Sequence, residues 1–236
     1  DLKVAARRVA SGKFLNAGQT CIAPDYVLVD ESVAARFVDL LVAEIATMYG
    51  SDPQRSADYG RIVNARHVTR LQGLLDGGGY AAVATGGSVD ADDRYIAPTV
   101  LTGVSADAAV MADEIFGPIL PVLTYSQGVS EAIEFVTARP KPLALYVFAD
   151  SATADRVLAD TSSGGAAVNQ VLMQVAVPEL PFGGVGPSGM GAYHGKAGFD
   201  TFSHRKSVLR RTTKPDPKLA YPPYSAIKQR LLRKLF

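Results

Sequence analysis

The chain has 236 residues, 47% hydrophobic and 20% charged, with a formal net charge of +1; this is an ordinary globular composition, long enough for one large domain or two small ones. A single cysteine excludes an intrachain disulfide and fits a reducing compartment, and no apolar run is long enough to span a bilayer. The charge is uneven, because residues 205–236 hold ten Lys or Arg against one acid, so an acidic body precedes a basic tail.

Amphipathic spacing from Leu2 to Phe14 predicts a first helix. The only cysteine, Cys21, follows in the run Gly18-Gln19-Thr20-Cys21-Ile22-Ala23-Pro24. Gly18 suits a tight turn after the helix, and Pro24 prevents a new helix just beyond the thiol. A cysteine on such a bend can point into a cleft and react, whereas composition alone favours a buried, structural thiol.

Strands and helices alternate through the rest of the body. The apolar pattern predicts strands over 26–30, 119–125, 143–149 and 165–169, the last one buried, and helices over 31–48, 64–75, 130–137 and 152–160. Nearly continuous apolar strands between helices are typical of a two-sided parallel sheet. We therefore expect the α/β class, with a mostly parallel twisted sheet flanked by helices. Pro121 predicts an edge or irregular position for its strand.

Three further features are candidates for a site. Glu114 and Phe116 lie in one turn before Gly-Pro; a carboxylate can accept two ribose hydroxyl bonds, and an aromatic ring can pack on a flat ring. The alternative is a loop with a solvated acid and a core phenylalanine. Asn169 ends its strand, where parallel sheets place ligands. The segment 181–191 is rich in glycine, which permits close backbone approach.

These segments together resemble the aldehyde dehydrogenase superfamily. The runs that carry the resemblance occur in its order and approximate spacing: 18–21, 114–118 and 181–186. Three longer runs are similar to its class 3 branch, which includes fatty and aromatic aldehyde dehydrogenases and bacterial coniferyl aldehyde dehydrogenases: 19–26, 142–148 and 191–196. The resemblance extends from Asp1 to about Tyr224.

The resemblance implies roles for particular residues. Cys21 takes the place of the catalytic nucleophile, Glu114 that of the carboxylate that holds the nicotinamide ribose, and Phe116 that of the ring beside the nicotinamide. Asn169 matches an asparagine near the catalytic centre with a supporting role. Four residues fall where the substrate tunnel is lined: Leu15, Thr20, Ile22 and Phe182. The implied reaction is oxidation of an aldehyde to a carboxylic acid with NAD or NADP, through a thiohemiacetal and a thioester on Cys21.

The sequence departs from the family in what it lacks. The Glu-Leu-Gly-Gly-Lys segment that carries the general base does not occur, and the Rossmann-type glycine turn belongs to the same upstream half. The chain also starts in a helical pattern at Asp1. We therefore expect a fragment or processed chain, with a catalytic domain over 1–196, an oligomerisation strand and basic tail over 197–236, and no N-terminal dinucleotide-binding half. The isolated chain is then expected to show no appreciable NAD-dependent turnover.

Two alternatives remain open for the function: a non-redox thiol esterase that uses Cys21, and a non-catalytic truncated fragment that only docks on its missing half. A metal site is not expected, because the three histidines lack ligand spacing: His67, His194 and His204. Nucleic acid is not an expected partner, because the body offers no basic stripe with interleaved aromatic residues.

The C-terminal region predicts partners of other kinds. The run 201–209 can form a strand, and the corresponding region of the family helps to form the subunit interface, so a homodimer is expected. The end of the chain, 227–236, alternates apolar and basic residues in a roughly helical pattern. Such a tail fits peripheral contact with an anionic membrane, and its alternatives are a solvated tail or one docked on an acidic protein surface. The expected location is cytoplasmic, with this membrane contact.

Overall fold

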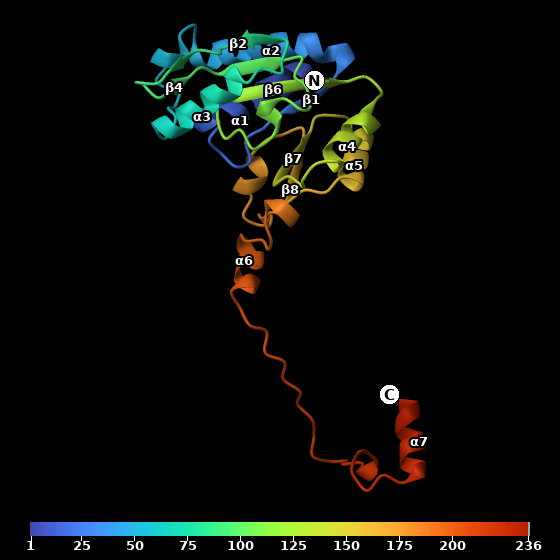
Figure 1. Ribbon diagram of the computed structural model, residues 1–236. Coiled ribbons are helices and arrows are strands. Elements are labelled where there is room, and N and C mark those ends of the chain that lie inside the picture. Colours follow the sequence, from blue (N-terminus) through green and yellow to red (C-terminus); the bar gives the residue numbers. More distant parts are fainter. Residues whose placement is uncertain (236) are drawn as a thin grey trace. The chain divides into compact units, whose positions relative to one another are not determined.

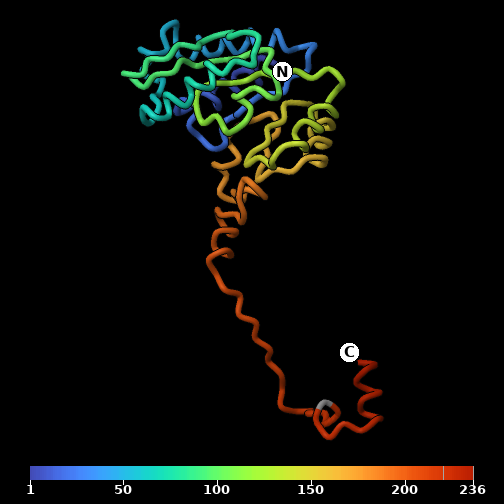
Figure 2. Tube along the Cα trace, viewed as in Figure 1, coloured from blue at the N-terminus to red at the C-terminus, as the bar shows by residue number. Residues whose placement is uncertain are grey.

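The computed structural model describes residues 1–235, and for Ala220 the backbone alone. The chain divides into two compact units, Asp1–Phe202 and Ser203–Phe236, which Figures 1 and 2 draw in chain colours from blue to red. The helices of the first unit are α1 (Leu2–Phe14), α2 (Glu31–Tyr49), α3 (Ala65–Asp76), α4 (Val129–Thr137), α5 (Ser151–Asp160) and α6 (Gly195–Thr201). Its strands are β1 (Val27–Asp30), β2 (Ala82–Thr85), β3 (Val89–Asp90), β4 (Tyr95–Ile96), β5 (Thr99–Thr102), β6 (Ile119–Tyr125), β7 (Ala144–Val147) and β8 (Gly165–Val168).

The main sheet of the first unit has the order β1-β6-β5-β2. The pairs β1–β6 and β5–β6 are parallel, and β2 runs antiparallel to β5, so the expected α/β class with a mostly parallel sheet is confirmed. Residues 119–123 of the central strand β6 are all buried. They share one core with apolar side chains of the helices around the sheet: Phe14 of α1, Leu41 of α2 and Leu71 of α3.

Helix starts follow the local sequence. Asp1 accepts hydrogen bonds from the N–H groups of Lys3 and Val4 at the start of α1, and Asp30, Asn64 and Asp150 cap α2, α3 and α5 in the same way. Such oxygen caps satisfy N–H groups that have no partner inside the helix. The helices and strands expected from the apolar pattern therefore lie within one or two residues of their predicted positions.

The expectation for Pro121 is wrong, because β6 lies inside the sheet between β1 and β5. Pro121 pairs with Leu101 of β5, while the ladder to β1 begins one residue later, at Val122 opposite Val27. The missing N–H of proline therefore does not interrupt the ladder to β1, which explains how an interior strand tolerates it.

A separate two-stranded parallel sheet is formed by β7 and β8. Figure 1 shows it with α4 and α5, apart from the four-stranded sheet. The strand over 165–169 was expected to be buried, but β8 is half-buried and Val168 is 40% exposed. Its only paired neighbour among residues 1–235 is β7, so the strand is not enclosed as a central strand would be.

The second unit, taken by itself, contains the short 3-10 helix η6 (Lys218–Ala220) and the helix α7 (Ala226–Leu235). Thr201 closes α6, and residues 203–209 have no paired strand among residues 1–235. The strand expected over 201–209 at a subunit interface stays a prediction. A strand needs a neighbour for its N–H and C=O groups. The predicted apolar and basic tail lies on α7, except for Phe236, which is outside the described residues. No helix within residues 1–235 has the length and apolar character needed to cross a bilayer.

Candidate active site

Cys21 lies on a tight turn directly after α1. The chain leaves the helix through the short 3-10 helix η1 (Leu15–Gly18), in which Asn16, Ala17 and Gly18 adopt left-handed φ values. A backbone hydrogen bond of 2.9 Å from the Ala23 N–H to the Thr20 oxygen then closes the turn around Cys21. The thiol is exposed, which favours the reactive interpretation over the buried one.

The Cys21 turn packs against the loop that carries Glu114 and Phe116. Gly18 has φ +73°, and a Cβ built on it would overlap the Gly117 carbonyl oxygen, so only glycine permits this approach. A second link lies four residues after the thiol, where the Asp25 carboxylate accepts the Ile115 N–H at 3.0 Å. The structure thus brings together two segments that are about ninety residues apart in the sequence.

Four charged side chains interact around this junction. Burial lowers the pKa of Lys13 from 10.5 to about 8, against the attraction of the Asp25 and Glu114 carboxylates. Desolvation raises the pKa of Asp25, and the positive charge of Lys13 opposes this shift. Desolvation also raises the pKa of Glu114, and the negative charge of Asp25 raises it further. Arg70 donates to the Ile115 carbonyl at 2.7 Å and adds positive charge to the same region.

Lys13 and Asp25 were not among the candidates from the sequence. Lys13 occupies a buried position near the end of the first helix and is only 1% exposed. A lysine among apolar helix positions was the available signal, because lysine is almost never fully buried unless it is paired. Its partners were not predictable, since helical spacing does not say which loop faces the helix.

A cavity of about 850 Å³ borders the site. Cys21, Ile22, Asp25 and Glu114 line it, with apolar side chains from α1, β1, α4 and β7. The other predicted tunnel residues are not part of its lining. Leu15 is 55% exposed and Thr20 is half-buried.

The two predicted aromatic residues also lie outside this lining. Phe116 follows Glu114 on the same loop, has a left-handed φ of 46° and is 40% exposed. Phe182 is half-buried and packs edge-on against Tyr193 and stacks on His194, with ring centroids 5.8 and 6.0 Å away. Cys21, Ile22 and Glu114 therefore line one cavity, and Phe116 follows Glu114 on the same loop.

Asn169 makes contacts that are typical of a supporting residue. It has a left-handed φ of 54°, and its side chain accepts the Ala149 N–H at 3.2 Å and donates to the Ala149 oxygen at 3.0 Å. Arg8 of α1 donates to the Asn169 backbone oxygen. These bonds connect the end of β8 to the segment after β7 and to the helix that leads to Cys21.

Comparisons with known proteins agree with the resemblance. The Aldehyde dehydrogenase family model matches residues 1–208. The chain is 51% identical over 225 residues to 4,4'-diaponeurosporen-aldehyde dehydrogenase of Staphylococcus aureus, covering 95% of this chain and 49% of that protein. It is 51% identical over 212 residues to bovine "Aldehyde dehydrogenase, dimeric NADP-preferring", and the match covers 89% of this chain and 87% of the bovine sequence. The chain spans about half the length of most of the curated relatives it matches.

Solved structures share the fold. A substrate-bound Staphylococcus aureus AldH superposes with a TM-score of 0.92 at 48% identity, covering 100% of this chain and 51% of that one. An NAD-dependent aldehyde dehydrogenase from Sinorhizobium meliloti superposes with a TM-score of 0.82 at 31% identity, covering 92% and 44%.

Proposed function

The chain belongs to the aldehyde dehydrogenase family, and we propose that Cys21 is the nucleophile with which the whole protein oxidises aldehydes to carboxylic acids, with NAD or NADP as hydride acceptor. The observation that carries the proposal is the position of the thiol. Cys21 is the only cysteine of the chain, it is exposed, and it lines the same cavity as Glu114.

The chemistry follows from these groups. The Cys21 thiolate attacks the aldehyde carbon, a C–S bond forms, and the carbonyl electron pair moves to oxygen to give a thiohemiacetal. No hydrogen bond from the Cys21 N–H is found within residues 1–235, so this group can donate to the oxyanion. When bound, NAD or NADP supplies the acceptor for the hydride of that carbon. Water then hydrolyses the thioester on Cys21 to the carboxylic acid and the free thiol.

Glu114 and Phe116 fit the ribose and nicotinamide end of the cofactor. Glu114 is an exposed residue whose carboxyl is partly desolvated, and no hydrogen bond to this carboxylate is found among the described residues, so both oxygens are open to the two ribose hydroxyls. The partly exposed Phe116 ring offers a flat surface on the same loop. The relatives described above include one named NADP-preferring and one named NAD-dependent, and both cofactors stay in the proposal.

The test uses the whole protein and its Cys21→Ala variant. We expect aldehyde-dependent formation of NADH or NADPH to fall by at least about a thousandfold in the variant, because the covalent route is lost. Retained turnover in Cys21→Ala would contradict the role of the thiol. The isolated 236-residue chain should give no steady NADH, and a single acylation of Cys21 by 4-nitrophenyl acetate is expected of the nucleophile under either function. Release of 4-nitrophenol over many turnovers without NAD or NADP, which disappears in Cys21→Ala, would favour the esterase alternative.

We also propose a homodimer. One relative is named dimeric, and the C-terminal part of this chain exposes large apolar side chains: Phe199, Phe202, Val208 and Leu209. Such side chains are usual at subunit interfaces. Analytical ultracentrifugation of the whole protein should give the dimer mass, and a monomer at micromolar concentration would reject the proposal.

For the location, we propose a cytoplasmic protein with peripheral contact to anionic membrane through α7. Ile227, Leu231 and Leu235 are exposed at helical spacing, and the same helix carries four basic residues: Lys228, Arg230, Arg233 and Lys234. Apolar and cationic faces together are typical of interfacial helices. Co-sedimentation with phosphatidylserine vesicles but not with phosphatidylcholine vesicles is the expected result, and no difference between them would contradict the proposal.

A further inference from the structure

The Cys21 turn is bound on its N-terminal side by the side chain of Gln19. The amide nitrogen of Gln19 donates to the Arg61 carbonyl at 3.0 Å, and its amide oxygen accepts the Val63 N–H at 2.9 Å. The same amide group donates to the Asn16 carbonyl at 3.0 Å. Gln19 therefore connects the backbone two residues before the thiol to a segment more than forty residues away.

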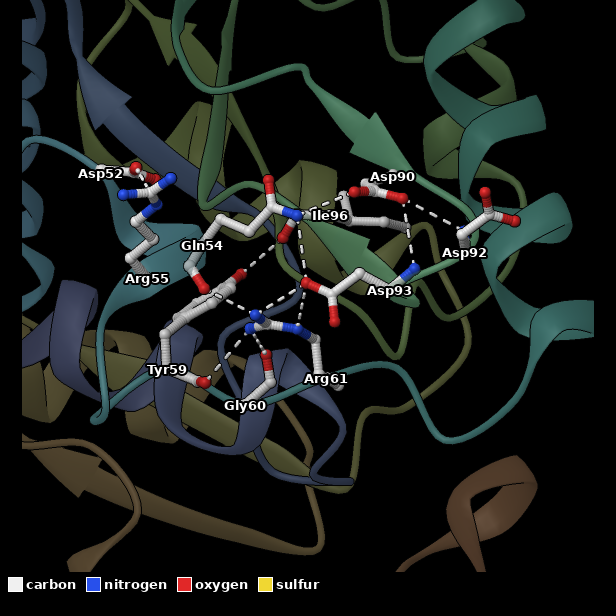
Figure 3. Close-up of polar contacts among 10 residues, drawn as sticks. All are labelled: Asp52, Gln54, Arg55, Tyr59, Gly60, Arg61, Asp90, Asp92, Asp93 and Ile96. Carbon is white, nitrogen blue, oxygen red and sulfur yellow. Dashed lines mark hydrogen bonds and ion pairs between the residues drawn. The ribbon is translucent and has the colours of Figure 1, made fainter.

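That segment is itself held by a polar network (Figure 3). The Arg61 guanidinium forms an ion pair of 2.8 Å with Asp93, which lies in the turn between β3 and β4, and donates to the Gln54 carbonyl at 2.6 Å. The Gln54 side chain donates to Asp93 as well, at 3.0 Å. The Arg61 and Asp93 side chains are 27% and 43% exposed, so solvent screens this ion pair only in part. The segment whose Arg61 carbonyl and Val63 N–H bind the Gln19 amide is thus held by contacts that do not involve the Cys21 turn.

On the other side of the thiol, Tyr146 of β7 binds the turn. Its hydroxyl donates to the Ile22 carbonyl at 2.7 Å, and it accepts a bond of 3.1 Å from the Gln174 amide. Desolvation raises the pKa of Tyr146, and the charge of nearby Cys21 acts in the same direction. The hydroxyl therefore remains a neutral donor at physiological pH.

We propose that Gln19 and Tyr146 are positioning residues for Cys21, which together fix the backbone on both sides of the thiol. The inference rests on the proposed role of Cys21 as nucleophile. With the flanking peptides held, the thiol keeps one main torsion, χ1, and the Cys21 N–H keeps its direction toward the bound carbonyl. Neither side chain exchanges protons or electrons with substrate. Their contribution is geometric, because a misplaced nucleophile loses rate steeply.

The test compares Gln19→Leu and Tyr146→Phe with Tyr80→Phe in the full chain. Tyr80 is a matched control, since its hydroxyl also donates to a backbone carbonyl, that of Leu75, at 2.7 Å, but far along the chain from the Cys21 turn. Amide hydrogen exchange over residues 19–23 reports the order of the turn without any activity. Because Cys21 is the only thiol, its acylation by 4-nitrophenyl acetate and its alkylation by iodoacetamide across pH can be followed directly.

We expect protection over residues 19–23 and the acylation rate to fall about tenfold in Tyr146→Phe, which loses the partly buried bond to Ile22, and at least as much in Gln19→Leu, which loses three bonds. The pH midpoint of alkylation should not move, because no charge is removed, and Tyr80→Phe should match the unaltered chain in all three measurements.

If the site variants keep the protection of the unaltered chain over residues 19–23, the positioning role is overturned. It is also overturned if protection falls but the acylation rate of Cys21 does not. A shifted alkylation midpoint would also overturn it, because the residues would then act on the thiol pKa. If the unaltered chain is not acylated at all, the proposed nucleophile fails instead. In that case lowered protection with an unmoved alkylation midpoint still supports the positioning role, and unchanged protection still rejects it.

Discussion

At the scale of single residues, Lys13 is the least expected feature of the molecule, because a charged side chain is buried with its pKa lowered from 10.5 to about 8. Below about pH 8 it is charged in both the folded and unfolded states, so the full cost of burying the charge opposes folding. Between about pH 8 and 10.5 the folded state binds fewer protons than the unfolded state, and stability rises with pH.

The variant Lys13→Met tests this. The neutral side chain carries no such cost, so the variant should be more stable relative to the unaltered chain at pH 7 than at pH 10.5, with a change of about 3 kcal/mol in the difference. Urea unfolding at both pH values measures it. A difference that is independent of pH would show that burial does not lower the pKa of Lys13 in the folded protein.

Gly18 is a second residue whose identity the local geometry requires. Gly18→Ala combines a strained φ of +73° with overlap on the Gly117 carbonyl, so we expect a loss of roughly 2–4 kcal/mol in the free energy of unfolding and greater separation of the Cys21 and Glu114 loops. Gly78→Ala is the matched control, because Gly78 has φ +64° but open space around its Cβ position. It should cost only about 1 kcal/mol; equal losses would mean that the close approach to Gly117 adds nothing.

The site could be predicted from the sequence only where a residue type and its neighbours already suggested chemistry. Cys21 and Glu114 were candidates, and both line the same cavity, although their catalytic roles remain predictions. Gln19 and Tyr146 carry no such signal, because their bonds reach 42 and 124 residues along the chain. Contacts of that range depend on the packing of separate elements, which a local pattern does not encode.

At the scale of elements, the helices were predictable because amphipathic spacing and oxygen caps are local properties. The errors concern strands, whose state depends on neighbours that the sequence does not name. Pro121 was expected at an edge or irregular position but lies in an interior strand, where the β1 ladder begins one residue later. The strand over 165–169 was expected to be buried but has one paired neighbour among residues 1–235. The interface strand expected over 201–209 is not among these errors and stays a prediction, because its neighbour would belong to a second subunit.

The junction of β7 and β8 depends on Asn169. Asn169→Ala removes both hydrogen bonds to Ala149. It also puts alanine, which adopts a left-handed backbone less readily than asparagine, at a position with φ 54°. We therefore expect a loss of roughly 2–3 kcal/mol in the free energy of unfolding. Asn169→Gly also loses the bonds but tolerates the backbone conformation, and should lose about 1 kcal/mol less. Urea denaturation measures both. Equal stability of all three proteins would show that these bonds form only weakly in solution.

At the scale of the whole molecule, the two units differ in how they are stabilised. All buried residues within the described part of the chain lie between Ala5 and Val171, so the first unit holds the hydrophobic core and the second holds none. Hydrophobic burial is the main favourable contribution to folding. A chain that ends at Phe202 should therefore unfold at the same temperature as the full chain, within about 2 °C, since little buried area is lost.

The same truncation tests whether residues 203–236 carry the dimer interface and the membrane contact. If the homodimer and the membrane contact both depend on residues 203–236, the shortened chain will sediment as a monomer and will not bind phosphatidylserine vesicles. Circular dichroism melting and ultracentrifugation, run on the full and shortened chains at equal concentration, measure the two effects separately. A large fall in melting temperature would mean that the tail stabilises the body directly. An unchanged dimer would assign the interface to the first unit, where Phe199 and Phe202 are the exposed candidates.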